Sequence, residues 1–222
     1  MVQRVEPDPR VRAYVMPARI VWKSGDGESL QNADQLLVPG SGQVTIWGGN
    51  YCVLKHIGEA PGLLLDFGRE LHGGVQIAVR HTGEGNKPVR VRVRFGESVS
   101  EAMNEPNQDH AVHDNICHLP WCGTHEVGNT GFRFVRIDLV DPGTQVELQQ
   151  VRAVFLYRDL DYIGTFRSND ERLNTIFDTG AYGVHLNMQT GVWDGIKRDR
   201  LVWIGDMHPE TTVISKIFGD QE

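Results

Sequence analysis

The sequence lacks an excess of positive charge and any long apolar run. Its 22 Lys and Arg residues are outnumbered by 29 Asp and Glu residues, which gives a formal net charge of −7. No basic field is therefore present to neutralise the phosphates of a nucleic acid. No stretch of the chain approaches the roughly 18 apolar residues that cross a bilayer. We expect neither nucleic acid nor a membrane to be a partner.

Cysteine is also scarce, with only Cys52, Cys117 and Cys122 in 222 residues. A chain of this length can bury an adequate core without disulfides, so we expect reduced thiols. Residues 1–12 are charged and contain proline where a signal peptide would be apolar. This pattern predicts no signal peptide in the chain and, by default, a cytoplasmic location.

Short apolar runs separated by glycine dominate residues 20–157 and favour antiparallel strands. The clearest is 89–95, where valines and Phe95 alternate with three arginines. We expect Arg90, Arg92 and Arg94 to point to solvent; a grip on an anionic ligand is the alternative. Further strands are predicted at 63–67, 75–79, 132–139 and 146–157, whereas the polar residues 101–130 predict a long loop.

The pattern changes to helical spacing near residue 165. Ser168 and Glu171 fit a capping box ahead of a helix of about five turns. Pro209 suits the first turn of a second helix, which Gly219 would end. The sequence predicts a mainly β protein, with a jelly-roll-like antiparallel β-sandwich over residues 1–164 and two or three α-helices over residues 165–222. Residues 1–59 carry the least specific pattern.

Residues 194–206 concentrate reactive side chains between the two predicted helices: Asp194, Arg198, Asp199, Trp203 and Asp206. Carboxylates serve as general acids and accept hydrogen bonds from hydroxyls, and Arg can hold a carboxylate or a sugar oxygen. Trp offers an apolar face to a pyranose ring. The combination favours sugar recognition, although such residues also cap and pair helix ends.

The chain resembles the bacterial α-L-rhamnosidases of glycoside hydrolase family 78 over roughly residues 60–222. The resemblance depends on GTFRSND at 164–170, Leu173-Asn174, Asn187-Met188 and the segment 194–206, and upstream on DFGRE at 66–70, Gly73-Gly74, FGE at 95–97 and GNTGFRFVRID at 128–138.

That resemblance implies an inverting hydrolase that removes terminal α-L-rhamnose from glycosides or polysaccharides and needs no cofactor or metal. Residues 165–222 would begin an (α/α)6 barrel of six helical hairpins. On the family pattern Asp199 aligns with the general acid, a position that is more often Glu, and Asp194, Arg198, Trp203 and Asp206 align with residues that line the rhamnose pocket.

The resemblance also implies that the chain stops before the rest of the barrel and before the acidic residue that the family uses as general base. We therefore expect a fragment that is inactive alone. Its helices should either pack on the sandwich or expose an apolar patch, and the chain should self-associate or be poorly soluble.

Two other functions stay open at this point. One is a noncatalytic carbohydrate-binding β-sandwich protein, and the other is an interaction module whose helices dock a partner chain. The residues His110, His113, Cys117, His118, Cys122 and His125 include the ligand types of zinc, but their spacing matches no common zinc motif, so we expect a polar loop there.

Overall fold

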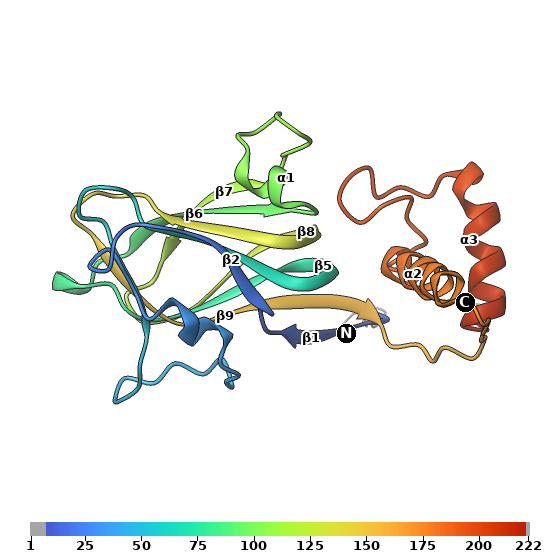
Figure 1. Ribbon diagram of the computed structural model, residues 1–222, viewed down its shortest axis with the longest axis horizontal. Helices are drawn as coiled ribbons and strands as arrows, with labels where there is room; N and C mark the ends of the chain where they lie inside the picture. Colours follow the sequence, from blue (N-terminus) through green and yellow to red (C-terminus); the bar gives the residue numbers. More distant parts are fainter. Residues whose placement is uncertain (1–7, 221–222) are drawn as a thin grey trace, which may run out of the picture. The chain divides into compact units, whose positions relative to one another are not determined.

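Strands fill the first two-thirds of the chain and helices the last third, in the computed structural model that describes residues 8–220 (Figure 1). By their internal contacts the described residues form two units, one of residues 14–155 and one of residues 8–13 and 156–220. The strands are β1 (Arg10–Val15), β2 (Arg19–Ser24), β3 (Leu30–Gln31), β4 (Cys52–Lys55), β5 (Gly62–His81), β6 (Val89–Gly96), β7 (Asp114–Leu119), β8 (Gly123–Leu139) and β9 (Gln145–Arg158), and the α-helices are α1 (Val99–Met103), α2 (Glu171–Asn187) and α3 (Ile204–Ile217).

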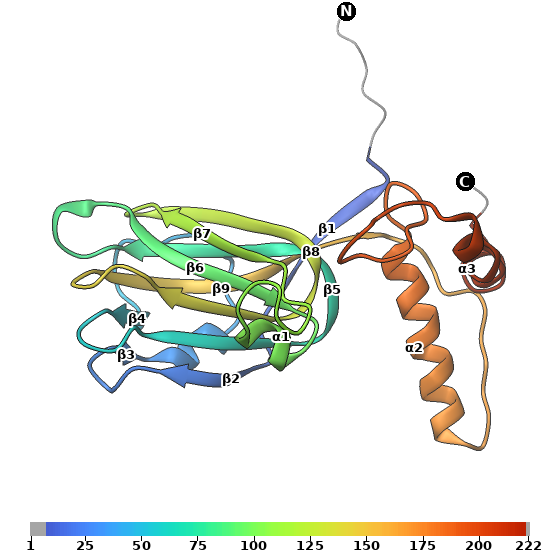
Figure 2. The ribbon, with the colours of Figure 1, turned by 90° about the horizontal axis from the view of Figure 1, so that it is seen from above.

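The sheet has the strand order β3-β4-β9-β5-β8-β6-β7, with β2 added beside β5. All pairings of β2 to β9 are antiparallel. The sheet curls back on itself, so that its strands face one another across a shared core (Figure 2). The largest fully buried side chains lie there, among them Phe95, Phe132, Leu65, Leu71 and Ile137. The predicted mainly β, antiparallel class is confirmed.

One long strand, β5, replaces the two strands predicted at 63–67 and 75–79. The first part of β5 pairs with β2, and its second part pairs with β9. Its pairing with β8 shifts register between Asp66 and Leu71 and again between Gly73 and Val75. These irregularities bend the strand, so it takes part in both halves of the curled sheet.

Asp66 joins three strands through its buried carboxylate. Arg133 on β8 donates to it at 2.8 and 3.0 Å, and Arg19 on β2 donates at 2.9 Å. The Gly68 N–H donates at 2.7 Å, which the left-handed conformation of Gly68 (φ 84°) permits. Burial alone would raise the pKa of Asp66, but the hydrogen bonds from Arg133, Gly68 and Arg19 outweigh burial and lower it to about 2.

The prediction of a long loop at 101–130 is wrong. This stretch contains the end of α1, all of β7 and the start of β8. The Ser98 hydroxyl caps α1 by accepting from the Glu101 N–H at 3.1 Å. Strand β7 pairs with β6, which sets Cys117 opposite Val91. The segment is polar although it contains a strand, because β7 lies at the edge of the sheet and the side chains on one of its faces are solvated.

The expectation that all three arginines of β6 point to solvent is wrong for Arg94, whose side chain is only 5% exposed. Arg92 is also partly buried, at 25% exposed, while Arg90 is the most exposed of the three. Each pairs with at least one carboxylate: Arg90 with Asp141, Arg92 with Asp114 and Glu105, and Arg94 with Glu105 and Asp138.

The helices begin at other residues than predicted. Asp170, not Ser168, caps α2, because the Asp170 carboxylate accepts from the Arg172 N–H at 2.9 Å. Helix α3 begins at Ile204, which places Pro209 inside the helix and not in its first turn. Gly219 follows α3 in the left-handed conformation (φ 63°), as predicted for the stop.

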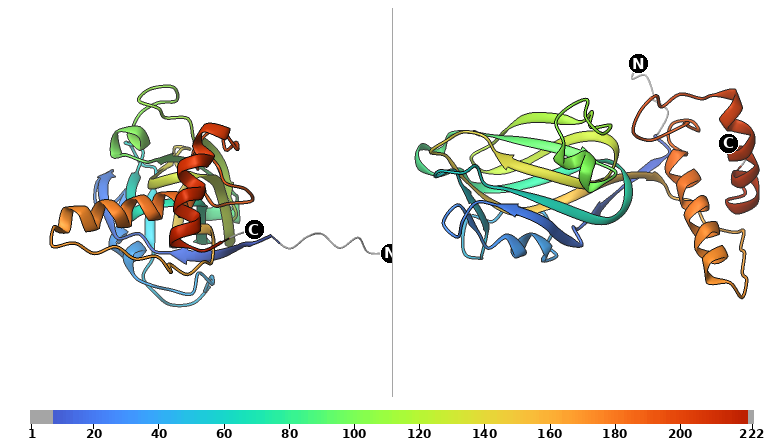
Figure 3. Two further views of the ribbon diagram at one scale, coloured as in Figure 1. Left: turned by 90° about the vertical axis from the view of Figure 1, so that its right-hand side faces the viewer. Right: turned by 45° about the horizontal axis from the view of Figure 1, so that its top comes forward.

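Helices α2 and α3 lie beside each other (Figure 3), and a small core holds them together. Ala181 and Met188 pack with Ile214, Ile217 and Phe218. Beside it lies His185, whose Nε2–H donates to the Arg158 carbonyl at 2.6 Å, which leaves Nδ1 to accept from the Tyr162 hydroxyl at 2.9 Å. None of the helices in residues 8–220 is long and apolar enough to cross a membrane.

Replacing Asp66 by Asn should destabilise the strand unit by about 2 kcal/mol at pH 7, since charge-assisted hydrogen bonds from two arginines are weakened. Because the folded pKa lies below the usual 3.8, the stabilisation is complete above pH 4 and is lost as the pH falls toward 2. Urea unfolding of both proteins between pH 2 and pH 7 measures this.

The control for that experiment is Asp34→Asn. Asp34 pairs with Lys23 on the surface, where the two side chains are 79% and 44% exposed, so its loss should cost less than about 1 kcal/mol. Equal urea midpoints for Asp66→Asn and Asp34→Asn would contradict the role given to Asp66.

Candidate functional site

The connection between α2 and α3 is closed into a loop by Asp194 and Leu201. The Asp194 N–H donates to the Leu201 carbonyl at 3.0 Å, and the Leu201 N–H donates to the Asp194 carboxylate at 2.8 Å. The Trp193 N–H donates to the Asn187 carbonyl at 2.9 Å, which ties the start of the loop to the end of α2. Asp194 therefore has a fixed backbone and one occupied carboxylate oxygen.

At the far end of this loop, Asp199 and Arg200 both have left-handed backbones, with φ of 62° and 55°. Two successive residues other than glycine in this region cost conformational energy, and such strain is concentrated at functional sites. Arg198 and Asp199 are exposed, and within residues 8–220 neither side chain forms a hydrogen bond or ion pair. Both are free to meet a ligand.

Trp203 and Asp206 lie at the start of α3. Trp203 is the N-cap residue and is 50% exposed, and Asp206 is in the first turn, where its negative charge suits the helix dipole. Leu201, Val202 and Ile204 around them are exposed as well, Ile204 at 87%. An acidic group and an indole thus share an apolar surface.

The sequence analysis missed Glu210, which is buried one turn after Asp206 on α3. Its Oε1 accepts from the Asn187 side-chain amide at 3.2 Å, and its Oε2 is buried without a hydrogen-bond partner among the described residues. Burial raises the pKa of Glu210, and the negative charges of Asp206 and Asp194 raise it further against the hydrogen bond from Asn187. The spacing of four residues between Asp206 and Glu210 is the signal that could reveal Glu210 in the sequence, because it puts both residues on one face of a helix that begins at Ile204.

The structure thus brings three of these carboxyl groups, Asp194, Asp206 and Glu210, into electrostatic contact. Arg198 and Asp199 lie in the same loop, but their side chains form no hydrogen bond or ion pair with that group in residues 8–220. Chemically, the arrangement offers acceptors for ligand hydroxyls, a carboxyl group whose pKa is raised, and an exposed acidic side chain, Asp199, on a strained turn.

Within the described part of the chain, no group of three or more His, Cys, Asp or Glu side chains is placed to hold a metal ion. Cys52, Cys117 and Cys122 are free thiols, as predicted. Burial raises the pKa of Cys52 to about 12, so this thiol is unreactive at neutral pH.

Comparison with protein-family models found no match to this sequence, and comparison with curated proteins found none either. Solved structures do share its fold. A rhamnosidase from Klebsiella oxytoca with rhamnose bound superposes with a TM-score of 0.70 at 18% identity, over 96% of this chain and 42% of that one.

Two further solved structures agree with the first. The GH78 family rhamnosidase of Bacillus sp. GL1 has a TM-score of 0.67 at 18% identity, over 84% of this chain and 18% of that one. The α-L-rhamnosidase from Dictyoglumus thermophilum has a TM-score of 0.57 at 21% identity, over 75% of this chain and 19% of that one.

The fold of this chain is therefore that of part of an α-L-rhamnosidase, and the resemblance noted in the sequence is confirmed for the fold. The chain spans less than half the length of each of these three proteins.

Replacing Glu210 by Gln should change how stability depends on pH. A carboxyl group whose folded pKa is raised binds its proton more tightly in the folded state, so its contribution to stability falls as the pH rises from the unfolded pKa through the folded one. Glu210→Gln keeps the hydrogen bond with Asn187 possible and removes that loss. The melting temperature of the variant should exceed that of the parent at pH 8 by more than at pH 4.

Asp178→Asn is the matched control, because Asp178 lies exposed on α2 with only a 3.9 Å ion pair to Arg167. It should leave the pH dependence of melting unchanged. If the melting temperatures of the parent and of Glu210→Gln differ by the same amount at every pH from 4 to 8, the pKa of Glu210 is not raised in the folded protein.

Proposed function

We propose that this chain is the N-terminal part of an inverting α-L-rhamnosidase, which removes terminal α-L-rhamnose from glycosides or polysaccharides. The main support is that the fold shared with the rhamnose-bound Klebsiella oxytoca protein extends over 96% of the chain, and so over both its strands and its helices. The reactive segment 194–206 connects α2 and α3.

In this proposal Asp199 is the general acid that protonates the leaving oxygen of the glycoside. Its exposed side chain and strained backbone suit a group that must reach a bound substrate. Asp194, Arg198, Trp203 and Asp206 bind the rhamnose, the carboxylates accepting from its hydroxyls and the indole packing against its ring.

Inversion requires a second carboxylate, about 6.5–9.5 Å from the acid, to activate water on the opposite face of the sugar. The resemblance assigns that base to a part of the enzyme beyond Glu222. We infer that residues 1–222 alone do not hydrolyse rhamnosides.

The decisive experiment expresses the complete open reading frame that contains this chain and measures release of an aryl alcohol from an aryl α-L-rhamnoside. Asp199→Asn should lower kcat by about 10²- to 10⁴-fold, the usual contribution of a positioned general acid. Asp199→Glu, which restores the residue more common in the family, should retain measurable activity.

Glu28→Ala is the control for that assay, since Glu28 is an exposed residue of the strand unit. It should leave kcat unchanged. Full activity in Asp199→Asn would remove Asp199 as the acid, and hydrolysis by residues 1–222 alone would remove the inference that the base lies beyond them.

The exposed apolar residues at the start of α3 predict self-association of the 222-residue chain. The exposed fractions are 53% for Leu201, 56% for Val202 and 87% for Ile204, and these residues are close neighbours in the chain. Light scattering should give a mass above the 24.9 kDa of one chain. Ile204→Ser should lower that mass toward the monomer, and a monomeric parent at all concentrations would contradict the prediction.

A further inference from the structure

A charged groove lies on the strand unit and belongs to none of the features described for the helices. It has a volume of about 400 Å³ and is formed by β2, β6 and β8 together with the turn before β5. Small-molecule sites typically enclose about 300–1,000 Å³, so the groove is large enough for a ligand.

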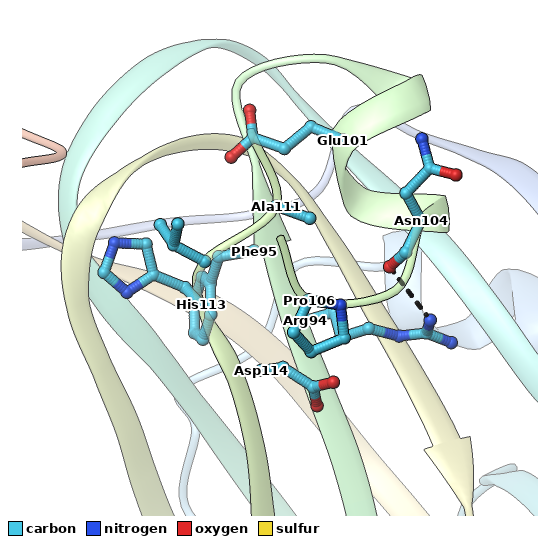
Figure 4. Close-up of a pocket in the computed structure, with 9 residues that line it drawn as sticks. Arg94, Phe95, Glu101, Asn104, Pro106, Ala111, His113 and Asp114 are labelled. Atoms are coloured by element: carbon cyan, nitrogen blue, oxygen red, sulfur yellow. Dashed lines mark hydrogen bonds between the residues drawn. The ribbon is translucent and has the colours of Figure 1, made fainter. Parts of the chain in front are cut away.

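The arginines of the groove are held in fixed positions by carboxylates. Arg94 donates to Asp138 at 2.9 Å and to Glu105 at 3.4 Å, and Arg92 donates to Glu105 at 3.2 Å. The same Nη1 of Arg94 that donates to Glu105 also donates to the Asn104 carbonyl at 3.3 Å (Figure 4). Because these side chains are already ordered, a ligand would not have to order them on binding.

The cavity shown in Figure 4, which Arg94 also lines, has a volume of only about 10 Å³. That is room for about one water molecule. A ligand of any size must therefore approach Arg94 from the open groove.

An aromatic side chain completes the groove. Arg136 lies over the Trp22 ring, with the guanidinium carbon 4.4 Å from the ring centroid, and it also donates to Asp138 at 3.0 Å. Trp22 packs against Leu64 and Phe134 and is partly exposed. The indole is thus fixed in place, and a ligand can contact only the part of it that Arg136 leaves exposed.

The charges of the groove balance. Its lining contains three guanidinium groups and three carboxylates: Arg92, Arg94, Arg136, Glu59, Glu105 and Asp138. An anion would meet the carboxylates, and a cation would meet the guanidinium groups, so neither gains from the groove as a whole.

A hydroxyl group, in contrast, both donates and accepts hydrogen bonds, so a ligand with many hydroxyls can satisfy both kinds of partner at once. We propose that this groove binds a neutral saccharide, with the exposed part of Trp22 as an apolar contact, Arg136 as the main donor, and Glu59 as an acceptor at the rim. Arg92, which already donates to Asp114 and Glu105, lines the groove beside them. This site is separate from segment 194–206 and does not depend on the proposed catalytic function.

The test is a titration of the full 222-residue chain, labelled with nitrogen-15, with L-rhamnose, D-galactose or raffinose as neutral probes and with sodium phosphate as the anionic probe. At least one saccharide should bind saturably with a Kd of about 10 mM or lower, which includes the range of weak ligands. The backbone amides that shift should lie in β2, β6 and β8 around Trp22, Arg92 and Arg136.

Two variants locate the binding. Trp22→Ala should weaken it at least tenfold, and Glu59→Ala should weaken it severalfold. Glu59 is exposed and makes no side-chain hydrogen bond or ion pair in the described residues, so its replacement should leave the fold intact even if Trp22→Ala destabilises it. The matched control Glu28→Ala, an exposed acid outside the groove, should bind like the parent.

Asp206→Asn separates this inference from the proposed catalytic function. Binding that persists in Asp206→Asn and weakens in Glu59→Ala supports the groove, whatever the activity assay shows. The proposal is overturned if no saccharide binds, if binding is unchanged in both Trp22→Ala and Glu59→Ala, or if phosphate shifts the groove amides and the saccharides do not.

Discussion

The strand unit depends on one buried carboxylate. Asp66 accepts hydrogen bonds from Arg19 on β2, from Arg133 on β8 and from the Gly68 N–H of its own strand, so it fixes the point at which β5 bends. A buried carboxylate without partners would be costly, and here several donors at hydrogen-bond distance more than compensate for burial. The DFGRE sequence that contains Asp66 therefore has a structural explanation that needs no ligand, whatever it does in the enzymes it resembles.

Much of the fold could be predicted because its pattern is local. The alternation of Val89, Val91, Val93 and Phe95 predicts β6, which the structure confirms. The burial of Arg94 could not be predicted, because its partners Glu105 and Asp138 lie 11 and 44 residues further along the chain, outside the strand pattern. The same limit applies to the helix starts. Ser168 and Asp170 are both good caps, and only the backbone conformation decides that Asp170 is the one used.

The candidate site shows the same division. Residues 194–206 attract attention because reactive side chains are dense there, and the structure adds a closed loop and a strained turn to that observation. The sequence pattern does not reveal Glu210, because Pro209 predicts a helix start between Asp206 and Glu210, whereas α3 begins at Ile204 and contains both residues. Glu210 stands out only through its proximity to Asp194 and Asp206, and that proximity is known only from the structure.

The order in which the strands are synthesised gives β9 a particular importance. It hydrogen-bonds to β4 on one side and to the second part of β5 on the other, yet it follows both in the chain by several strands. Until the ribosome has synthesised β9, the position between β4 and β5 in the sheet is unfilled. The edges of β4 and β5 that face this position then present unpaired backbone groups. The sheet is complete only when β9 pairs with both β4 and β5. Until then these two strands of the nascent protein can pair with the wrong strand or with another chain.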